Sequence, residues 1–212
     1  NEKLQMLLKI NKHEIISWEG KLRPSLEYTG IYPRVENGEL PIWIATGGTP
    51  ESSLRAGAFG LPITYAIIGG NPRRFARNIE IYKSIALSYG HDPSKLPIGV
   101  HSWGYVAETD EQAKREFFPS LKAHQDIIGK ERGWPAFDEN AFEREIGSHG
   151  AIYLGSPETV AQKIIDTIET LGINRFMIHT PVGSMPHEYV MNSIRLFGER
   201  VKPIVDKYFE DK

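Results

Sequence analysis

The chain has 212 residues, of which 40% are hydrophobic and 25% charged, and a formal net charge of -2; that is enough for one domain with a sizeable core, and it gives no basic surface for nucleic acid or acidic membranes. It has no cysteine, which excludes disulfides, thiolate metal sites and thiol catalysis and fits a cytoplasmic protein. No apolar run approaches the roughly 18 residues of a membrane span and no signal peptide is recognisable, so we expect no membrane partner.

The first 40 residues predict a helix followed by a small β excursion. Residues 2–11 are apolar at helical spacing, and 14–33 hold two short β-like runs around Glu19 and Gly20. The chain begins at Asn1, inside what already reads as a helix. We therefore expect a segment upstream of Asn1 to be missing.

The stretch from 40 to 70 predicts a strand, a glycine turn, a helix and a second strand. Residues 42–45 form an apolar run typical of a buried parallel strand, and 61–67 form the next one. Between them, Gly47 and Gly48 precede Thr49, a good N-cap, and Pro50, which suits the first helical position. Two glycines before a helix let a ligand approach the backbone, and free N–H groups there attract an anion. An ordinary capped helix is the alternative interpretation.

The rest of the chain continues the alternation of strands and helices. Further helices are expected at 72–89, from 109 or 110 to about 128 with a kink at Pro119, after Asp138 within an insertion at 130–150, from 156 to 171, and from about 186 to 209 with a break near Pro203. Strands are expected at 96–107 and 175–180, with a short extended piece at 151–154. Ser156 and Thr159 suggest a helix cap or a second anion site, and we favour the cap.

This alternation predicts a parallel sheet with right-handed crossovers. Four βα units are visible, and an eight-fold barrel usually needs about 250 residues, so we expect the second half of a (β/α)8 barrel of the TIM-barrel type. A doubly wound sheet is the structural alternative. No G-x-G-x-x-G and no Walker lysine occur, which excludes the usual dinucleotide and P-loop interpretations.

Four segments, in this order and spacing, resemble the bacterial luciferase-like, flavin-dependent monooxygenase family: PIWIATGGTPESSLRAGAFGLPI (41–63), GVHSWGYVAETDEQA (99–113), YLGSPETVAQKI (153–164) and FMIHTPVGSMPHEYVMNSIRLFGERVKP (176–203). The resemblance covers essentially the whole chain and implies a single 1–212 domain that runs from the fourth helix of a (β/α)8 barrel to its end. It further implies a monooxygenase that uses reduced FMN and molecular oxygen on a small organic substrate. An F420-dependent reductase and a non-catalytic half-barrel that binds a phosphate-bearing ligand are the alternatives.

The resemblance also implies a cofactor site. The flavin phosphate would lie near the turn after the strand at 42–45, at Gly47, Gly48, Thr49 and Ser52. The flavin ring would lie beside the end of the strand at 61–67, at Tyr65, Ala66 and Ile67.

Two histidines are the catalytic candidates. His101 and Trp103 alternate on one strand and so share a face, where His101 could move a proton. His179 ends another strand, the usual place for barrel chemistry. Filling of the barrel interior is the alternative role for His101 and Trp103, and a hydrogen-bonded structural histidine is the alternative for His179. His187 and Glu188 are adjacent with no second histidine four residues on, so we expect no metal.

The expected partners are a small-molecule substrate, oxygen and a flavin reductase. A half-barrel leaves sheet edges and apolar faces that must be covered, so we also expect a homo-oligomer.

Overall fold

The computed structural model describes residues 1–36, 38–180 and 182–212. Its contacts divide the chain into two compact units, Asn1–Trp43 and Ile44–Lys212. That the whole chain forms a single domain therefore stays a prediction. In the described part of the chain, no helix is long and apolar enough to cross a membrane.

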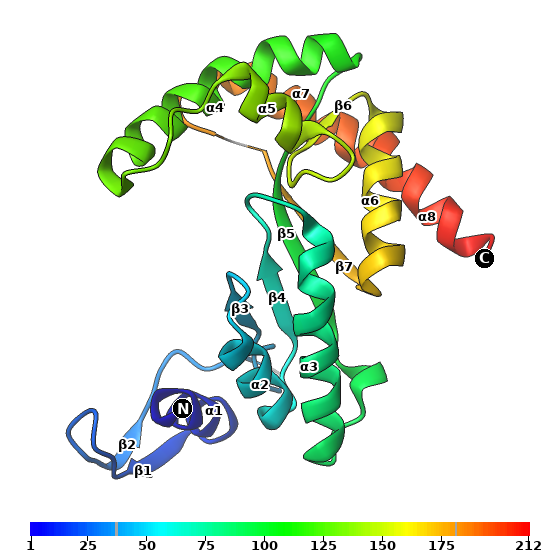
Figure 1. Cartoon of the computed structure of the whole chain (residues 1–212). Coiled ribbons are helices and arrows are strands. Elements are labelled where there is room, and N and C mark those ends of the chain that lie inside the picture. The colour runs from blue at the N-terminus through cyan, green and yellow to red at the C-terminus, as the bar shows by residue number, and fades with distance from the viewer. Residues whose placement is uncertain (37, 181) are drawn as a thin grey trace. The chain divides into compact units, whose positions relative to one another are not determined.

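The first unit holds the predicted helix and hairpin. Helix α1 (Glu2–Lys12) precedes strands β1 (Ile15–Trp18) and β2 (Leu26–Gly30), which pair antiparallel (Figure 1). The Asn11 side chain holds the end of the unit, because its amide donates to the Leu40 carbonyl at 2.9 Å and its oxygen accepts from the Leu40 N–H at 2.9 Å.

The second unit is built on a parallel five-stranded sheet. Strands β3 (Ile44–Thr46), β4 (Ile63–Ala66) and β5 (Ile98–Val106) are neighbours in that order, and β5 also pairs with β6 (Tyr153–Gly155) and β7 (Arg175–His179). The α/β fold with a parallel sheet is confirmed. The extended piece predicted at 151–154 is a fifth strand, because β6 pairs with Gly104–Val106 at the far end of the long strand β5.

Helices connect the strands as expected. They are α2 (Pro50–Phe59), the 3-10 turn η1 (Pro72–Phe75) with α3 (Ala76–Ser88), the 3-10 turn η2 (Pro93–Lys95), α4 (Asp110–Arg132), α5 (Glu139–Ile146), α6 (Pro157–Leu171), α7 (His187–Leu196) and α8 (Lys202–Glu210). Helix α4 continues through Pro119 and ends at Gly133, whose φ of 67° is left-handed. The predicted break near Pro203 is a π-helical turn η3 (Phe197–Val201), after which Pro203 lies in the first turn of α8, where its missing N–H costs little.

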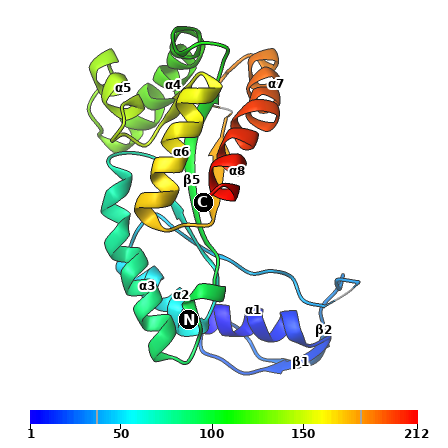
Figure 2. The same ribbon diagram turned by 90° about the vertical axis from the view of Figure 1, so that its right-hand side faces the viewer.

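The core lies between the sheet and the helices. In Figures 1 and 2, helices α2 and α3 cover one side of β3, β4 and β5, and α6 lies beside α8. The buried cluster on the α2–α3 side includes Ala56, Ile63, Tyr65, Ile67, Ile79, Tyr82, Ile98 and Val100.

Strand register defines the opposite face, which we call the inner face. Ala66 of β4 aligns with His101 of β5, and Trp103 of β5 aligns with His179 of β7. Because aligned residues of neighbouring strands point to the same side, and alternate residues to opposite sides, these four side chains point away from the α2–α3 cluster.

Candidate cofactor turn and catalytic face

The turn after β3 is held tightly on one side. The Gly48 N–H donates to Thr46 Oγ1 at 3.1 Å, and Asn78 Nδ2 on α3 donates to the Gly48 carbonyl at 2.6 Å. Gly48 has a φ of 104°, and a Cβ built there would lie 2.6 Å from Phe75 Cε1. Only glycine allows this close approach of the turn to the Phe75 ring.

The other side of the same turn is open. Thr49 is the N-cap residue of α2, as predicted, but its hydroxyl accepts no bond from the helix backbone and instead lies 2.8 Å from the Ser52 hydroxyl. A Cβ on Gly47 would meet nothing within 4 Å. Two hydroxyl groups and the start of a ten-residue helix thus border open space at exposed Gly47. These donors fit a phosphate group.

The start of α6 carries a similar sequence but is already closed. Ser156 Oγ accepts from the Thr159 N–H at 3.3 Å, which is an ordinary cap and confirms the cap interpretation of these two residues. Asp110 also accepts from the Ser156 N–H at 2.6 Å and from the Thr159 hydroxyl at 3.0 Å. The carboxylate of the chain itself therefore takes the donors that an external anion would use.

The strand end at 65–67 offers less to a ligand than the sequence suggested. Tyr65 and Ile67 are fully buried in the α2–α3 cluster, and the Tyr65 hydroxyl lies 2.8 Å from Ser53 Oγ. Burial raises the pKa of Tyr65 to about 12, so its phenol stays neutral. Consecutive strand residues alternate between faces, so a ring on the inner face would meet Ala66 and the main chain, not the Tyr65 and Ile67 side chains.

The histidines and Trp103 come together on the inner face. The His101 and His179 ring centres are 5.3 Å apart, and Trp103 stacks on His179 at 4.5 Å with an interplanar angle of 21°. Burial, and then the nearby His179, lower the pKa of His101 below its usual 6.5, so His101 is neutral at pH 7 and able to accept a proton. The predicted shared face of His101 and Trp103 is confirmed.

Three residues near these groups carry no motif in the sequence. His124 on α4 lies against Trp103 with ring centres 5.7 Å apart. Asn78 holds the Gly48 carbonyl, and the Glu145 carboxylate accepts the Gly70 N–H at 3.1 Å in the loop after β4. Each of these residues contacts a partner that is distant in the sequence, so the contact follows from how the helices pack on the sheet and no local motif could have predicted it.

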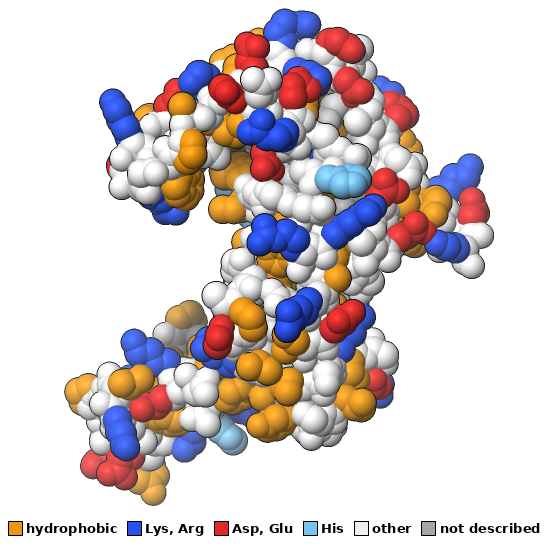
Figure 3. Space-filling model, in the orientation of Figure 1, with side chains coloured by type: hydrophobic (Ala, Val, Ile, Leu, Met, Phe, Trp, Pro, Cys, Tyr) orange, Lys and Arg blue, Asp and Glu red, His pale blue; other side chains and the backbone are white. Residues whose placement is uncertain are grey.

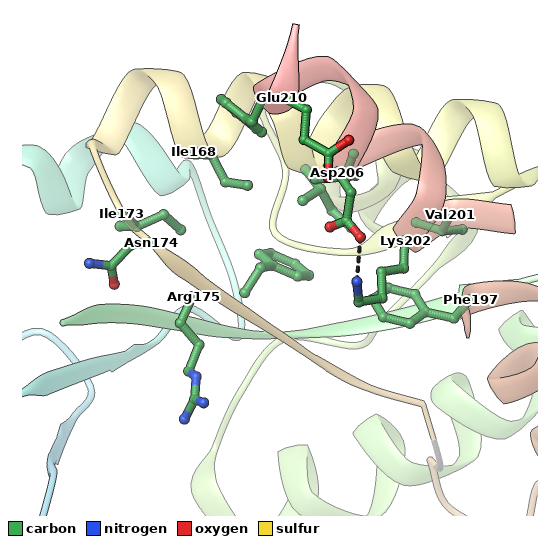
Figure 4. A pocket seen from close by; sticks show the side chains of 13 residues that line it. Ile168, Ile173, Asn174, Arg175, Phe197, Val201, Lys202, Asp206 and Glu210 are labelled. Atoms are coloured by element: carbon green, nitrogen blue, oxygen red, sulfur yellow. Dashed lines mark hydrogen bonds and ion pairs between the residues drawn. The ribbon is translucent and has the colours of Figure 1, made fainter. Parts of the chain in front are cut away.

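Another cavity lies away from the inner face. A space of about 680 Å³, lined mainly by apolar side chains of α6, η3 and α8, adjoins Asn174 and Arg175 where β7 begins (Figure 4). Lys202 pairs with Asp206 at its rim. It lies beside the amino end of a strand, whereas reaction sites of barrels lie at the carboxyl ends. Among the described residues, no group of three or more His, Asp or Glu side chains could hold a metal.

The parallel βα units, with their open turn and polar inner face at the carboxyl ends of the strands, define part of a (β/α)8 barrel. The profile of the luciferase-like monooxygenase family matches residues 1–175. The chain belongs to the luciferase-like monooxygenase family.

Known relatives agree in fold and are longer. The alkanal monooxygenase alpha chain of Aliivibrio fischeri is 24% identical over 200 residues, covering 82% of this chain and 54% of the relative. The crystal structure of the monooxygenase RslO1 of Streptomyces bottropensis aligns with a TM-score of 0.77 at 22% identity, over 95% of this chain and 59% of that one. The chain thus spans somewhat more than half the length of these relatives.

Two further solved structures differ in cofactor. The oxygenating constituent of 3,6-diketocamphane monooxygenase of Pseudomonas putida, in complex with FMN, aligns with a TM-score of 0.63 at 21% identity, over 96% of this chain and 62% of that one. The coenzyme F420-dependent tetrahydromethanopterin reductase of Methanopyrus kandleri aligns with a TM-score of 0.64 at 14% identity, over 95% and 62%. A flavin-type cofactor is therefore supported for the family, with both kinds represented.

Proposed function

We propose that this chain carries part of the active site of a flavin-dependent monooxygenase that uses reduced FMN and oxygen on a small organic substrate. The observation that carries the proposal is the contrast between two similar helix starts. At α6, Asp110 occupies the backbone and hydroxyl donors, whereas at α2 the Thr49 and Ser52 hydroxyls border open space. The turn at 47–52 is where the cofactor phosphate binds.

A side chain of α3 orients the peptide group between Gly48 and Thr49. Asn78 draws the Gly48 carbonyl to the α3 side. Because a trans peptide is planar, with C=O and N–H on opposite sides, the Thr49 N–H points the other way. That N–H, the two hydroxyls of Thr49 and Ser52, and the positive end of the α2 dipole would then converge on one anion.

The inner face supplies proton handling. When bound, the reduced flavin supplies the electrons for oxygen activation, and the protein orients the reactants and excludes water. His101, neutral at pH 7, accepts a proton from the substrate side, and His179 beside it provides a second site for that proton. Trp103 covers one face of the His179 ring.

An F420-dependent reductase is the second candidate, supported by the reductase-like structural neighbour. Both cofactors carry a phosphate, so the turn accepts either. A non-catalytic half-barrel with a phosphate-bearing ligand differs from both, since it would bind the cofactor without oxygen consumption or substrate reduction.

The test is an anaerobic calorimetric titration of the full chain with reduced FMN. Gly47→Asp places a carboxylate in the open side of the turn without backbone strain, and we expect affinity to fall at least about fivefold, from charge repulsion of about 1 kcal/mol or more at about 4 Å. Gly47→Ala, without the charge, and Gly198→Asp, at another glycine with open surroundings, should bind as the parent does. Equal affinity for Gly47→Asp and Gly47→Ala would refute the phosphate position. Binding of reduced F420 alone would favour the reductase.

A further inference from the structure

A second cavity adjoins the inner face. It has a volume of about 570 Å³. It lies under helices α4 and α5, in the hollow beneath these two helices in the upper part of Figure 3. Its lining comes from β5, the loop after β4, α4, α5 and the segments that flank α5, and it includes Trp103, His124, Ile128, Arg132, Trp134 and Glu145. This volume is in the range of sites that enclose a whole small molecule.

The walls are mostly apolar and aromatic. Trp103 links the cavity to the pair of histidines, because it lines the cavity and its ring stacks on His179, and it also contacts His124. Ile128, Trp134 and Phe137 line the α4 side. Aromatic and apolar walls of this kind favour an apolar or aromatic ligand.

Of the two charged side chains that the described residues place at the cavity, Glu145 is already engaged by backbone N–H groups and Arg132 is available to a ligand. Among the described residues that line it, the charged side chains are Arg132 and Glu145, with His124 as the other titratable group. Both Glu145 oxygens accept the Gly70 N–H at 3.1 Å, and one also accepts the Ala151 N–H at 3.2 Å. The Arg132 guanidinium lies 5.1 Å from the Trp134 ring centre and forms no ion pair or hydrogen bond with the described residues.

We propose that this cavity binds the substrate, and that the substrate is an aromatic or bulky apolar carboxylic acid. The apolar body packs against Trp103 and Ile128, and the carboxylate pairs with Arg132, whose planar fork suits two-point recognition of a carboxylate. The reacting end then lies beside His179. This inference rests on the proposed function, since it assigns the substrate class of the same site.

The test compares two probes that differ only in charge. The affinities of 2-naphthoate and 2-naphthalenemethanol for the full chain are measured by calorimetry. We expect the carboxylate to bind about tenfold more tightly, and Arg132→Met to remove that preference while leaving the alcohol unchanged, because a charge-assisted pair at a partly exposed site is worth about this factor. Arg115→Met, at an exposed arginine on the same helix and outside the cavity, is the control and should keep the preference.

A second pair of variants tests the location. Ile128→Trp fills the cavity and should abolish binding of both probes, whereas Ile127→Trp, at a neighbouring side chain that is 63% exposed, should bind both normally. Equal affinity of the two probes, or binding that survives in Ile128→Trp, would overturn the proposal. Either result with FMN binding still dependent on Gly47 leaves the proposed function intact. Normal naphthoate binding without any flavin binding refutes the proposed function instead.

Discussion

Replacement of Gly48 by alanine tests how tightly the cofactor turn is built. The new methyl group faces two obstacles, a φ of 104° that L side chains rarely adopt and an approach of 2.6 Å to Phe75 Cε1. Phe75 cannot easily retreat, because its ring packs edge-on against buried Tyr65 with centres 5.8 Å apart. Gly47 is the matched neighbour, since its added methyl group would meet nothing within 4 Å.

The expected loss of stability follows from these two costs. A positive φ at a residue with a Cβ costs about 1–2 kcal/mol, and an extra methyl group in a packed site costs about 1–3 kcal/mol. Gly48→Ala should therefore lower the free energy of unfolding by about 2–5 kcal/mol, and Gly47→Ala should change it by no more than about 0.5 kcal/mol. The loss of unfolded-state entropy is common to both variants and cancels in the comparison.

Urea unfolding followed by far-ultraviolet circular dichroism measures the difference. The double variant Gly48→Ala/Phe75→Ala should recover the steric part of the loss, about 1–3 kcal/mol relative to the sum of the single variants, but not the part due to φ. Similar midpoints and slopes for Gly48→Ala and Gly47→Ala would show that the turn yields to a side chain and would refute the reasoning.

Two titrations extend these predictions. In an NMR titration His101 should show a pKa below 6.5, and His179→Asn should raise it only in part, because burial is the larger cause; a pKa above 6.5 in the parent would contradict a desolvated His101. Burial raises the pKa of Tyr153 to about 12, so the folded chain favours its neutral form. This preference contributes up to about 3 kcal/mol to the free energy of unfolding. The contribution is complete below pH 10 and is lost as the pH rises toward 12. Between pH 8 and 11, Tyr153→Phe should lose less stability than the parent chain does. At every pH the variant should also be about 1 kcal/mol less stable, because it lacks the hydrogen bond to Thr167. Identical pH slopes of the two chains in urea unfolding would refute this prediction.

The elements that sequence reasoning placed correctly are those whose ends depend on local chemistry. Asp138 caps α5 through its own carboxylate, which accepts the Ala141 N–H at 2.7 Å, and Gly60 ends α2 with a φ of 62°. Such signals need only neighbouring residues. Strand faces are different: alternation puts Tyr65 and Ala66 on opposite sides, but only the packing of the helices shows that the Tyr65 side faces the core.

The two helix starts show the same limit more sharply. Gly-Thr-Pro-Glu at 48–51 and Gly-Ser-Pro-Glu at 155–158 are nearly the same sequence, and each places a hydroxyl residue before a proline. Asp110, 46 residues before Ser156, closes the second start. No local pattern contains that carboxylate, so the difference between an open helix start at α2 and an occupied one at α6 could come only from tertiary structure.

The position of the cofactor turn depends on the unit that follows it. Strand β3 ends at Thr46, but the turn after it is held by Phe75 and Asn78, which lie beyond β4. The loop after β4 is held in turn by Glu145 on α5, beyond β5. The ends of β3 and β4 are thus each fixed by a later βα unit. The groups that we propose to meet a phosphate are therefore preorganised by the folded sheet, and an isolated 40–70 segment would lack the contacts that orient the Gly48 peptide.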